Sequence, residues 1–473
     1  MPPILPLKAV ASSPEKAAGR SPGNLTTYAR SGAASGQWPR HAASAKLAHK
    51  MRDLGTEAIF RWAGGVALAL AVAACVPKGE LALRHTRSAR EIPMPSADFV
   101  VYVAAAEVAI AEANQAIDRP LRTHVIEERA PFELVPGRGR CPRGADGRHA
   151  KAALLLHDLG GTPYEMRDLG RVLAERCYLV RAILLPGHGT VPGDLLEIDY
   201  RQWIEATRSA VASFEGEAEQ LVLVGFGLGA TLAVHHVLSA PPRSDPALGG
   251  LVLLAPALGT DPPLAWLRVP LRYGQPGPQA RWARLLPDYD PVRYESLPRN
   301  AEIQRARLVE EVVARDALLE VQVFLVISAD DAEVDPGAAR DWFCRRLSGP
   351  RRLIWYTTAP GRSTDCRFVA ERSSAAAPDI LDLSHVALPI APDNPRYGID
   401  GSHHDCSHYY WEEDTPNWLI CVDVTKTTAN SELRYGEITE ANLQRHVLRR
   451  LTYNPDFEAM VGLMLAFLAD PNS

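Results

Sequence analysis

The chain has 473 residues, of which 47% are hydrophobic and 23% charged, a globular composition with enough apolar material for a large core. The net charge of -5 is mild, and the absence of a basic stripe excludes nucleic acid as a partner. Residues 1–50 differ from the rest, because they are rich in Ala, Ser, Gly, Arg and Pro and show no apolar periodicity. We expect them to be a disordered or untranslated leader, with Met51 as the true start.

Residues 51–75 follow the pattern of an export signal. A positive region leads into an apolar run from Trp62 to Ala74, which ends in Val72-Ala73-Ala74-Cys75. This ending resembles the lipobox of bacterial lipoproteins, in which the cysteine is acylated and becomes the mature N-terminus. The run is too short to span a membrane comfortably, so a lipidated Cys75 would hold the domain on a membrane surface. A plain secretory signal or a buried helix is the alternative.

The remaining cysteines fit an exported protein. Their number is even once Cys75 is removed, which favours disulfides in an oxidising compartment. Cys406 and Cys421 are close in sequence and form our best single predicted pair, whereas reduced core cysteines are the alternative. The six are Cys141, Cys177, Cys344, Cys366, Cys406 and Cys421.

Residues 76–149 are expected to form a tether with an N-terminal helix and edge strands. Residues 76–96 are polar and irregular, and Ala97–Asp118 is Ala-rich with helical spacing. Two short apolar pieces, Thr123–Ile126 and Phe132–Val135, are predicted as edge strands.

Residues 150–470 alternate between strand and helix patterns, which predicts an α/β fold with a mainly parallel sheet wrapped by helices. The connection at about 257–319 is unusually long, and we expect it to insert a helical cap over the functional site. The predicted strands are Ala152–His157, Tyr178–Leu185, Leu221–Phe226, Gly250–Ala255, Val321–Ser328 and Arg352–Thr357. The predicted helices are Tyr164–Arg176, Tyr200–Phe214, Leu228–Ser239, Asp335–Leu347, Thr439–Arg449 and Asp456–Leu468.

The third of these strands leads directly into Gly225-Phe226-Gly227-Leu228-Gly229-Ala230 and then a helix. The stretch resembles the G-x-S-x-G nucleophile elbow, in which a strand turns sharply into a helix and the flanking glycines leave room for the turn. The middle position is Gly227, so the serine nucleophile is absent. A dinucleotide-binding turn is disfavoured, because it needs a different glycine spacing near the first strand and an acidic residue further on.

Two earlier stretches strengthen the resemblance to carboxylesterases and monoacylglycerol lipases of the α/β-hydrolase superfamily. Two later stretches, Pro392–Gly398 and Tyr435–Glu437, resemble an exported bacterial subset of that superfamily. His157-Asp158-Leu159-Gly160-Gly161 is similar to the family's H-G-x-x-G loop, and the resemblance implies that the backbone N–H groups of Leu159 and Leu228 form the oxyanion hole. Asp158 stands where the family has glycine, and a carboxylate that pointed inward would oppose a developing oxyanion. Pro186-Gly187-His188-Gly189 matches a further family stretch, in which the histidine is structural.

The acid and the base of a triad are identified by the same resemblance. Asp331 follows the strand at Val321–Ser328 three residues before a valine, and His385 lies in a long loop after the last strand. The chain order 227, 331, 385 is the order that this fold uses. Asp330 and Glu333 are neighbours that compete with Asp331 for the role of the acid. The acidic cluster can alternatively cap the next helix. The alternative for His385 is a histidine in a surface loop.

A dense polar cluster follows at residues 403–414. Histidines and carboxylates at short spacing can bind zinc or copper, but neighbours in sequence seldom give closed ligand geometry. We therefore predict a polar loop held by Cys406, with no metal and no cofactor. Its members are His403, His404, Asp405, Cys406, His408, Glu412, Glu413 and Asp414.

The resemblance, which covers about 150–468, implies a carboxylic-ester hydrolase of the esterase/lipase type. Because Gly227 offers no attacking oxygen, we expect impaired catalysis with a retained pocket for an acyl-ester or lipid-like small molecule. The sequence does not decide whether the protein is an active enzyme. One alternative is an active hydrolase that uses water or another nucleophile with Asp331 and His385, although no replacement carboxylate sits at position 227. The other is a recently active esterase. The expected location is an exported lipoprotein on a membrane surface.

Overall fold

The computed structural model describes residues 81–115, 119–137, 139–239, 245–259, 277–359, 366, 369–374, 377–412, 415–423 and 433–470. The predicted leader, export signal and lipidation site at Cys75 lie outside these residues. Within the described part of the chain, no helix combines the length and apolar character needed to cross a membrane.

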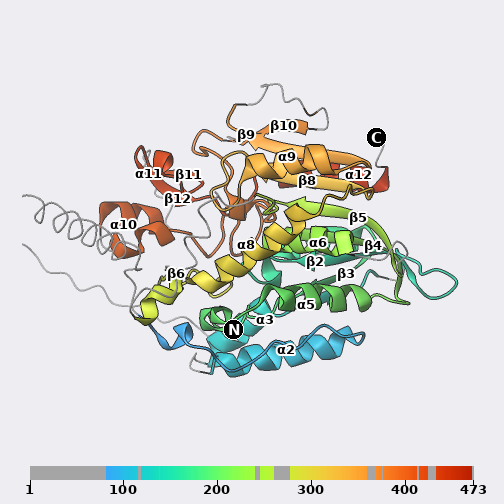
Figure 1. Ribbon diagram of the computed structural model, residues 1–473. Coiled ribbons are helices and arrows are strands. Elements are labelled where there is room, and N and C mark those ends of the chain that lie inside the picture. Colours follow the sequence, from blue (N-terminus) through green and yellow to red (C-terminus); the bar gives the residue numbers. More distant parts are fainter. Residues whose placement is uncertain are drawn as a thin grey trace, which may run out of the picture. The chain divides into compact units, whose positions relative to one another are not determined.

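The centre of the domain is an eight-stranded sheet in the order β1-β3-β2-β4-β5-β8-β9-β10 (Figure 1). Every neighbouring pair is parallel except β1 and β3, which are antiparallel. The central strands are buried on both faces, which is why they read as continuous apolar runs in the sequence. The strands are β1 (Phe132–Leu134), β2 (His149–Leu156), β3 (Tyr178–Ile183), β4 (Ala218–Phe226), β5 (Ala247–Leu254), β8 (Val323–Ser328), β9 (Arg351–Thr357) and β10 (Val369–Ser373).

Two hydrophobic cores lie on opposite faces of this sheet. Along β2, Leu154 and Leu156 belong to one core and Leu155 to the other, as the alternation of side chains in a strand requires. The first core is completed by α2 (Phe99–Ala113), α5 (Tyr200–Ala212), α6 (Leu228–Ser239), α8 (Arg299–Ala314) and α9 (Pro336–Arg346). The second is completed by α4 (Arg167–Glu175) and α12 (Phe457–Ala469). The predicted mainly parallel sheet wrapped by helices is therefore confirmed.

The long connection between β5 and β8 contains several short elements before α8. Its described part holds the 3-10 helix η4 (Pro278–Arg281) and an antiparallel pair, β6 (Trp282–Arg284) with β7 (Leu297–Pro298). The C-terminal region adds η5 (His385–Ala387), η6 (Ser407–Glu412), α10 (Pro416–Val422), α11 (Glu440–Leu443) and a parallel pair, β11 (Leu433–Gly436) with β12 (Val447–Arg450). The first element of the described residues is η1 (Leu83–His85), and η2 (Pro163–Met166) and η3 (Pro192–Leu196) precede α4 and α5.

Two of the sequence predictions are wrong. Thr123–Ile126 is not an edge strand but part of α3 (Arg119–Arg129), where Val125 is buried while Thr123 and His124 are exposed, a helical rather than an alternating pattern. The predicted helix at Thr439–Arg449 ends early, because its second half is strand β12, whose hydrogen bonds to β11 outweigh the local helical preference.

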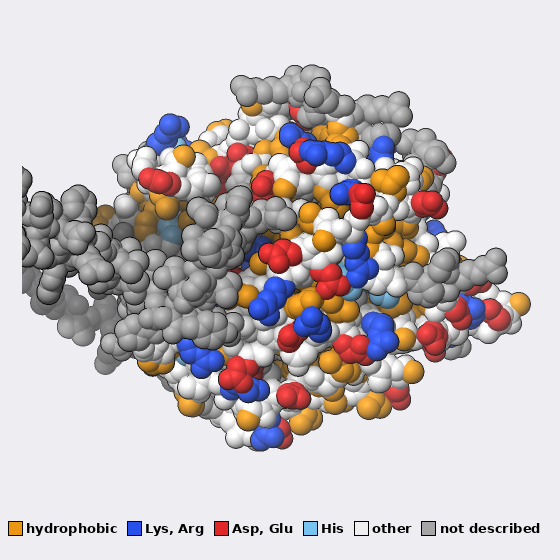
Figure 2. Space-filling model, viewed as in Figure 1, with side chains coloured by type: hydrophobic (Ala, Val, Ile, Leu, Met, Phe, Trp, Pro, Cys, Tyr) orange, Lys and Arg blue, Asp and Glu red, His pale blue; other side chains and the backbone are white. Residues whose placement is uncertain are grey.

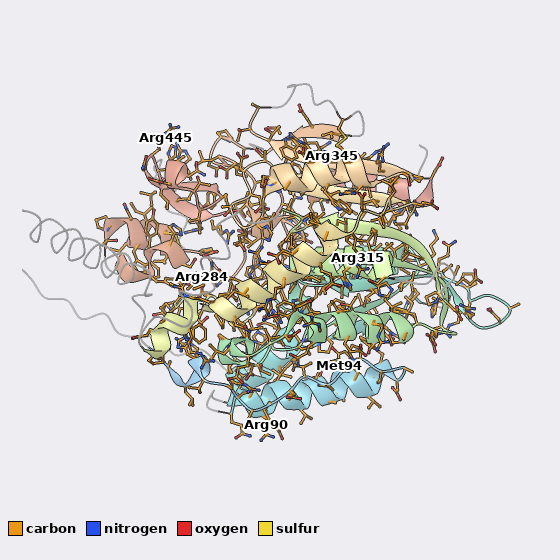
Figure 3. The ribbon with its side chains drawn as sticks, in the orientation of Figure 1. Arg90, Met94, Arg284, Arg315, Arg345 and Arg445 are labelled. Carbon is orange, nitrogen blue, oxygen red and sulfur yellow. A yellow bond between two sulfur atoms is a disulfide. The ribbon has the colours of Figure 1, made fainter. Side chains whose placement is uncertain are left out.

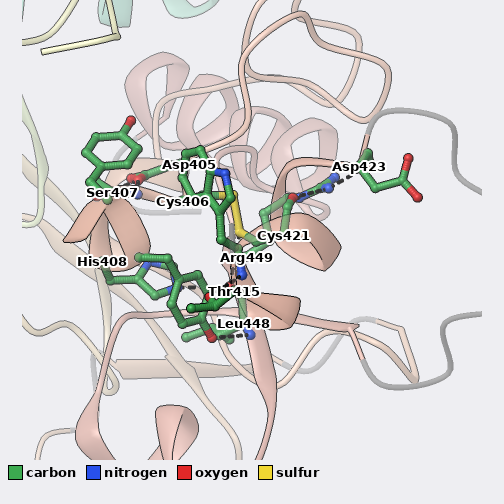
Figure 4. Close-up of a disulfide and its surroundings, with 12 residues drawn as sticks. Asp405, Cys406, Ser407, His408, Thr415, Cys421, Asp423, Leu448 and Arg449 are labelled. Carbon is green, nitrogen blue, oxygen red and sulfur yellow. Dashed lines mark hydrogen bonds between the residues drawn. A yellow bond between two sulfur atoms is a disulfide. The ribbon is translucent and has the colours of Figure 1, made fainter. Parts of the chain in front are cut away.

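Three disulfides join all six cysteines that follow the predicted signal. They are Cys141–Cys177, Cys344–Cys366 and Cys406–Cys421, so the one predicted pair is confirmed. The third links Cys406, which directly precedes η6, to α10, and Arg449 of β12 donates to the Cys421 carbonyl beside it (Figure 4). The disulfide thus ties the polar loop to α10, and the buried hydrogen bond ties α10 to β12.

Replacing both cysteines of the third pair, Cys406→Ala/Cys421→Ala, should lower the free energy of unfolding by about 3 kcal/mol, because a loop of this length is then free in the unfolded chain. Urea unfolding of the double variant beside the natural protein measures the difference. A reducing agent should abolish most of the gap between the two proteins. An unchanged midpoint in the double variant would show that the bond contributes nothing to stability.

Candidate active site

The turn from β4 into α6 has the geometry of a nucleophile elbow. Gly227 occupies it with φ +50°, in the left-handed region that suits glycine. A Cβ on Gly225 would lie 2.4 Å from the backbone nitrogen of Ala230, and one on Gly229 would lie 2.2 Å from the carbonyl oxygen of Leu156. The two flanking glycines are therefore required by close backbone contacts, as the sequence pattern predicts.

The Asp158 carboxylate lies directly over the elbow. A Cβ built on Gly227 would be 1.9 Å from Asp158 Oδ1, so this oxygen stands where a side chain at position 227 would begin. The same Oδ1 accepts a hydrogen bond of 2.8 Å from the backbone N–H of Leu228. The carboxylate thus takes up both the space of the expected nucleophile and one of the two predicted oxyanion donors. Leu159, which carries the other, is half-buried against the first core.

His385 lies between two carboxylates at the start of η5. Its Nδ1 is 2.7 Å from Asp331 Oδ2, and its Nε2 is 3.3 Å from Asp158 Oδ2. The imidazole stacks on the ring of Phe226 in the elbow, with 4.8 Å between the ring centroids. The structure therefore brings the predicted acid and base together at Gly227, and it adds a second carboxylate at the nitrogen that would face a nucleophile.

Backbone hydrogen bonds orient the Asp331 carboxylate towards His385. Its Oδ1 accepts hydrogen bonds from the N–H groups of Glu333 and Val334 at 2.9 and 3.0 Å, which leaves Oδ2 for the imidazole. Asp330 turns instead towards Ser374, and burial raises its pKa to about 6. Of the three neighbouring acids weighed from the sequence, only Asp331 is hydrogen-bonded to His385.

The electrostatics of the site favour a charged imidazole. Burial alone would lower the pKa of His385, but Asp331, Glu333 and the hydrogen bond to Asp158 outweigh it and hold the pKa well above its usual range. Burial would likewise raise the pKa of Asp158, but the hydrogen bond and charge of His385 lower it. A carboxylate oxygen thus lies at each ring nitrogen of His385, an arrangement that stabilises the imidazolium.

Arg293, from the connection between β5 and β8, balances this negative charge. Its Nη1 is 2.6 Å from Glu165 Oε1, and its Nη2 is 3.8 Å from Asp158 Oδ2. Burial raises the pKa of Glu165 to about 7 against the opposing charge of Arg293. Neither residue was predicted from the sequence, because neither belongs to a recognisable motif and only the fold brings them to Asp158.

A second buried arginine supports the histidine loop from β12. Arg450 Nη2 is 2.7 Å from Glu333 Oε1 and 2.8 Å from Glu437 Oε1. The other oxygen of Glu437 accepts the backbone N–H of His385 at 2.8 Å. The loop that carries His385 is thus held by an ion-pair network rather than by apolar packing alone.

One group of potential metal ligands lies here, since single ligand atoms of Asp158, Glu333 and His385 come within 4.8 Å of one another. Arg450 pairs with Glu333 and Arg293 borders Asp158, so two guanidinium groups supply the positive charge that a cation would bring. The cluster at residues 403–408 is differently engaged. His408 Nε2 lies 2.9 Å from the carbonyl of Leu448, and Cys406 is in a disulfide.

A small cavity lies beside Arg293 and Val386, the residue that follows His385. Its volume is about 30 Å³, room for a water molecule or two. The cavity is lined by Glu165, Asp290, Arg293, Val386, Ile390, Tyr397, His403, Asp405 and Thr452. Arg293 also lines a groove of 810 Å³ that runs between η1, the end of α2 and residues 288–294. The groove, and not the small cavity, has the size of a typical ligand site.

Comparisons with known proteins identify the family of the chain. The profile of the alpha/beta hydrolase family matches residues 153–413. Over 190 residues, 39% of this chain and 72% of the relative, the chain is 25% identical to the thermostable monoacylglycerol lipase of Bacillus sp. (strain H-257). It is 32% identical over 92 residues to the carboxylesterase of Bacillus subtilis (strain 168), 19% of this chain and 37% of the relative.

A solved structure of the Paleococcus ferrophilus monoacylglycerol lipase superposes on 53% of this chain and 92% of its own, with 18% identity and a TM-score of 0.37. A metagenome-derived lipolytic enzyme covers 48% of this chain and 87% of its own, with 21% identity and a TM-score of 0.38. The family match spans more than half of the sequence and contains the elbow, Asp158, Asp331 and His385. The chain belongs to the alpha/beta hydrolase family and is related to monoacylglycerol lipases and carboxylesterases.

Proposed function

We propose that this protein is an esterase/lipase-type family member that has lost acyl-serine catalysis and binds an acyl-ester or lipid-like small molecule. The observation that carries the proposal is the Asp158 carboxylate at the elbow, 2.8 Å from the Leu228 nitrogen. Acyl transfer needs an attacking oxygen, a neutral base and donors for the oxyanion. Gly227 lacks the oxygen, and the Asp158 carboxylate already accepts the Leu228 N–H. The carboxylates around His385 outweigh its burial and raise its pKa well above the usual range, which disfavours the neutral base.

The groove beside Arg293 is the proposed ligand site. Leu83, Val125 and Pro192 give it apolar walls, and Arg84, Arg129 and Arg293 bring positive charge. Arg129 is already used by the carbonyls of Gly189 and Thr190, whereas Arg293 reaches from the groove to the Asp158 site. A ligand with an apolar chain and a polar ester end suits such a lining.

Hydrolysis of a short-chain activated ester by the natural protein tests the proposal. We expect no His385-dependent turnover. The natural protein and a His385→Ala variant should therefore hydrolyse the ester at the same rate, that of the ester in buffer alone. A ligand should nevertheless bind, as followed by a shift in thermal unfolding with a monoacylglycerol or its non-hydrolysable ether. Turnover that is lost in His385→Ala would contradict the loss of catalysis.

A second candidate function has one specific observation in its favour. Asp158 Oδ2 lies 3.3 Å from His385 Nε2, so a carboxylate stands beside the base although none sits at position 227. In this alternative Asp158, or water next to it, serves as the nucleophile together with Asp331 and His385. Asp158→Asn distinguishes the two candidate functions, because it keeps the shape of the side chain but removes the carboxylate. If Asp158 is the nucleophile or activates the water, this variant should lose all His385-dependent activity. Two hydrogen bonds, from Leu228 and His385, and the nearby charge of Arg293 stabilise the carboxylate and weaken it as a nucleophile, so this candidate ranks second.

We also propose that the protein is exported and anchored through an acylated Cys75. Three disulfides in one domain support an oxidising compartment. Cys75→Ser should move the protein from the membrane fraction to the soluble fraction or leave its signal uncleaved, and mass spectrometry of the N-terminal peptide measures acylation directly. An unmodified Cys75 within an uncleaved chain would refute the anchor.

A further inference from the structure

The helix α2 has an apolar strip on its outer side. Its inner side is buried in the first core through Phe99, Tyr102 and Ile110. The outer side of a surface helix is normally polar, but here Val101 and Val108 are 59% and 57% exposed. Helical spacing places these valines on one line with Ala104, which is also exposed, and with the half-buried Ala111; Val100, 68% exposed, adjoins them. We call Val100, Val101, Ala104, Val108 and Ala111 the α2 strip.

The α2 strip lies at the margin of the domain, next to the point where the described chain begins. Figure 1 shows α2 as the outermost helix beyond α5 and the sheet, and Figure 2 shows hydrophobic atoms along the same edge with charged side chains between them. Leu83 of η1 is 77% exposed and lines the same groove as Ala113 at the end of α2. Exposed apolar side chains are therefore present on both η1 and α2.

Little charge opposes an apolar contact there. None of the α2 strip residues is ionisable, and Glu112 at its edge is paired with Arg90, 3.1 Å away. Arg90 and Met94 lie on the segment that leads into α2 (Figure 3), and Met94 is itself 40% exposed. Glu107 is the exposed acid on the other edge of the helix.

We propose that the α2 strip rests on a lipid surface and orients the domain on the membrane. The inference rests on the proposed anchor at Cys75. Only residues 76–80 separate Cys75 from Leu81, and even a fully extended chain of that length reaches about 20 Å. An acylated Cys75 therefore holds η1 close to the headgroups, and an apolar helix face at that level adds to the membrane affinity of an acyl anchor.

Transfer of the acylated, full-length protein from donor to acceptor vesicles of phosphatidylethanolamine and phosphatidylglycerol tests this role. Val101→Glu/Val108→Glu should leave the donor vesicles at least about tenfold faster than the natural protein, since each valine loses its apolar contact. The matched control is Val135→Glu, because Val135 is 54% exposed but lies after β1. Thermal unfolding of all three proteins should agree, since every changed side chain is exposed.

Two results would overturn the proposal. The first is equal transfer rates for the natural protein and Val101→Glu/Val108→Glu. The second is a concentration-dependent dimer in sedimentation that this double variant abolishes, because the α2 strip would then join two copies of the chain. Failure of the anchor is recognised separately, by an unmodified Cys75 in mass spectrometry, and co-sedimentation of that protein with the same vesicles then tests the strip alone.

Discussion

Asp158→Gly combined with Gly227→Ser should create esterase activity that neither single change creates. A serine at position 227 cannot be placed while the Asp158 carboxylate stands 1.9 Å from its Cβ. Asp158→Gly alone empties the site but supplies no nucleophile. The double variant has room for the hydroxyl, frees the Leu228 N–H for the oxyanion and leaves His385 with one carboxylate, so that its pKa can fall towards that of a neutral base.

The expected gain is about 10³-fold or more in kcat/KM for a short-chain activated ester, the range lost when a triad member is removed. The four proteins are compared at equal concentration, and His385→Ala in the double variant should remove the gain. Labelling of the introduced serine by a fluorophosphonate reports the nucleophile independently of turnover. Gly227→Ser alone reaching the rate of the double variant would show that Asp158 swings aside and does not block the elbow.

The second large effect concerns stability. His385→Ala should lower the free energy of unfolding by about 3–5 kcal/mol, because Asp158 and Asp331 are then left as buried carboxylates without their shared partner. Urea unfolding at pH 6 measures the loss. In an Asp158→Asn/Asp331→Asn background the same change should cost much less, since the charges that need the imidazolium are gone. A small loss in both backgrounds would mean that the three groups are not coupled.

The pH dependence of this contribution follows from the directions of the pKa shifts. The pKa of His385 is raised in the folded protein, so its contribution is complete below the unfolded value near 6.5 and is lost as pH rises through the folded value. The pKa of Asp158 is lowered, so its contribution is present above the unfolded value near 3.8 and is lost as pH falls through the folded value. The difference between the natural protein and His385→Ala should therefore be largest between about pH 4 and 6.5 and shrink in alkali.

The positions at the elbow illustrate how far sequence patterns reach. Gly225, Gly227 and Gly229 follow a buried strand and precede a helix, and the close backbone contacts of this turn make the pattern readable without coordinates. Asp331 and His385 are readable for a similar reason, because each follows a strand end in the order that the fold uses. The departure at Asp158 was also visible, but not the direction of its side chain.

Other parts of the site have no local signature. Arg293 comes from a long connection, and Arg450 lies just after a predicted helix, at the end of what is strand β12. Each is positioned by ion pairs with residues far away in the sequence. Thr123–Ile126 was misread for the same reason, since a few apolar residues fit a short strand as well as a helix until their neighbours are known. Long-range ion pairs and helix packing decide such cases.

By itself the sequence determined the α/β sheet, the order of elbow, acid and histidine, the missing serine and the Cys406–Cys421 pair, because each depends on local periodicity or short spacing. Only the tertiary structure decided that Asp158 fills the elbow, that His385 lies between two carboxylates and that Arg293 and Arg450 surround them. These contacts join segments 50 to more than 200 residues apart, and which side chain points inwards there depends on the packing of two layers against one sheet.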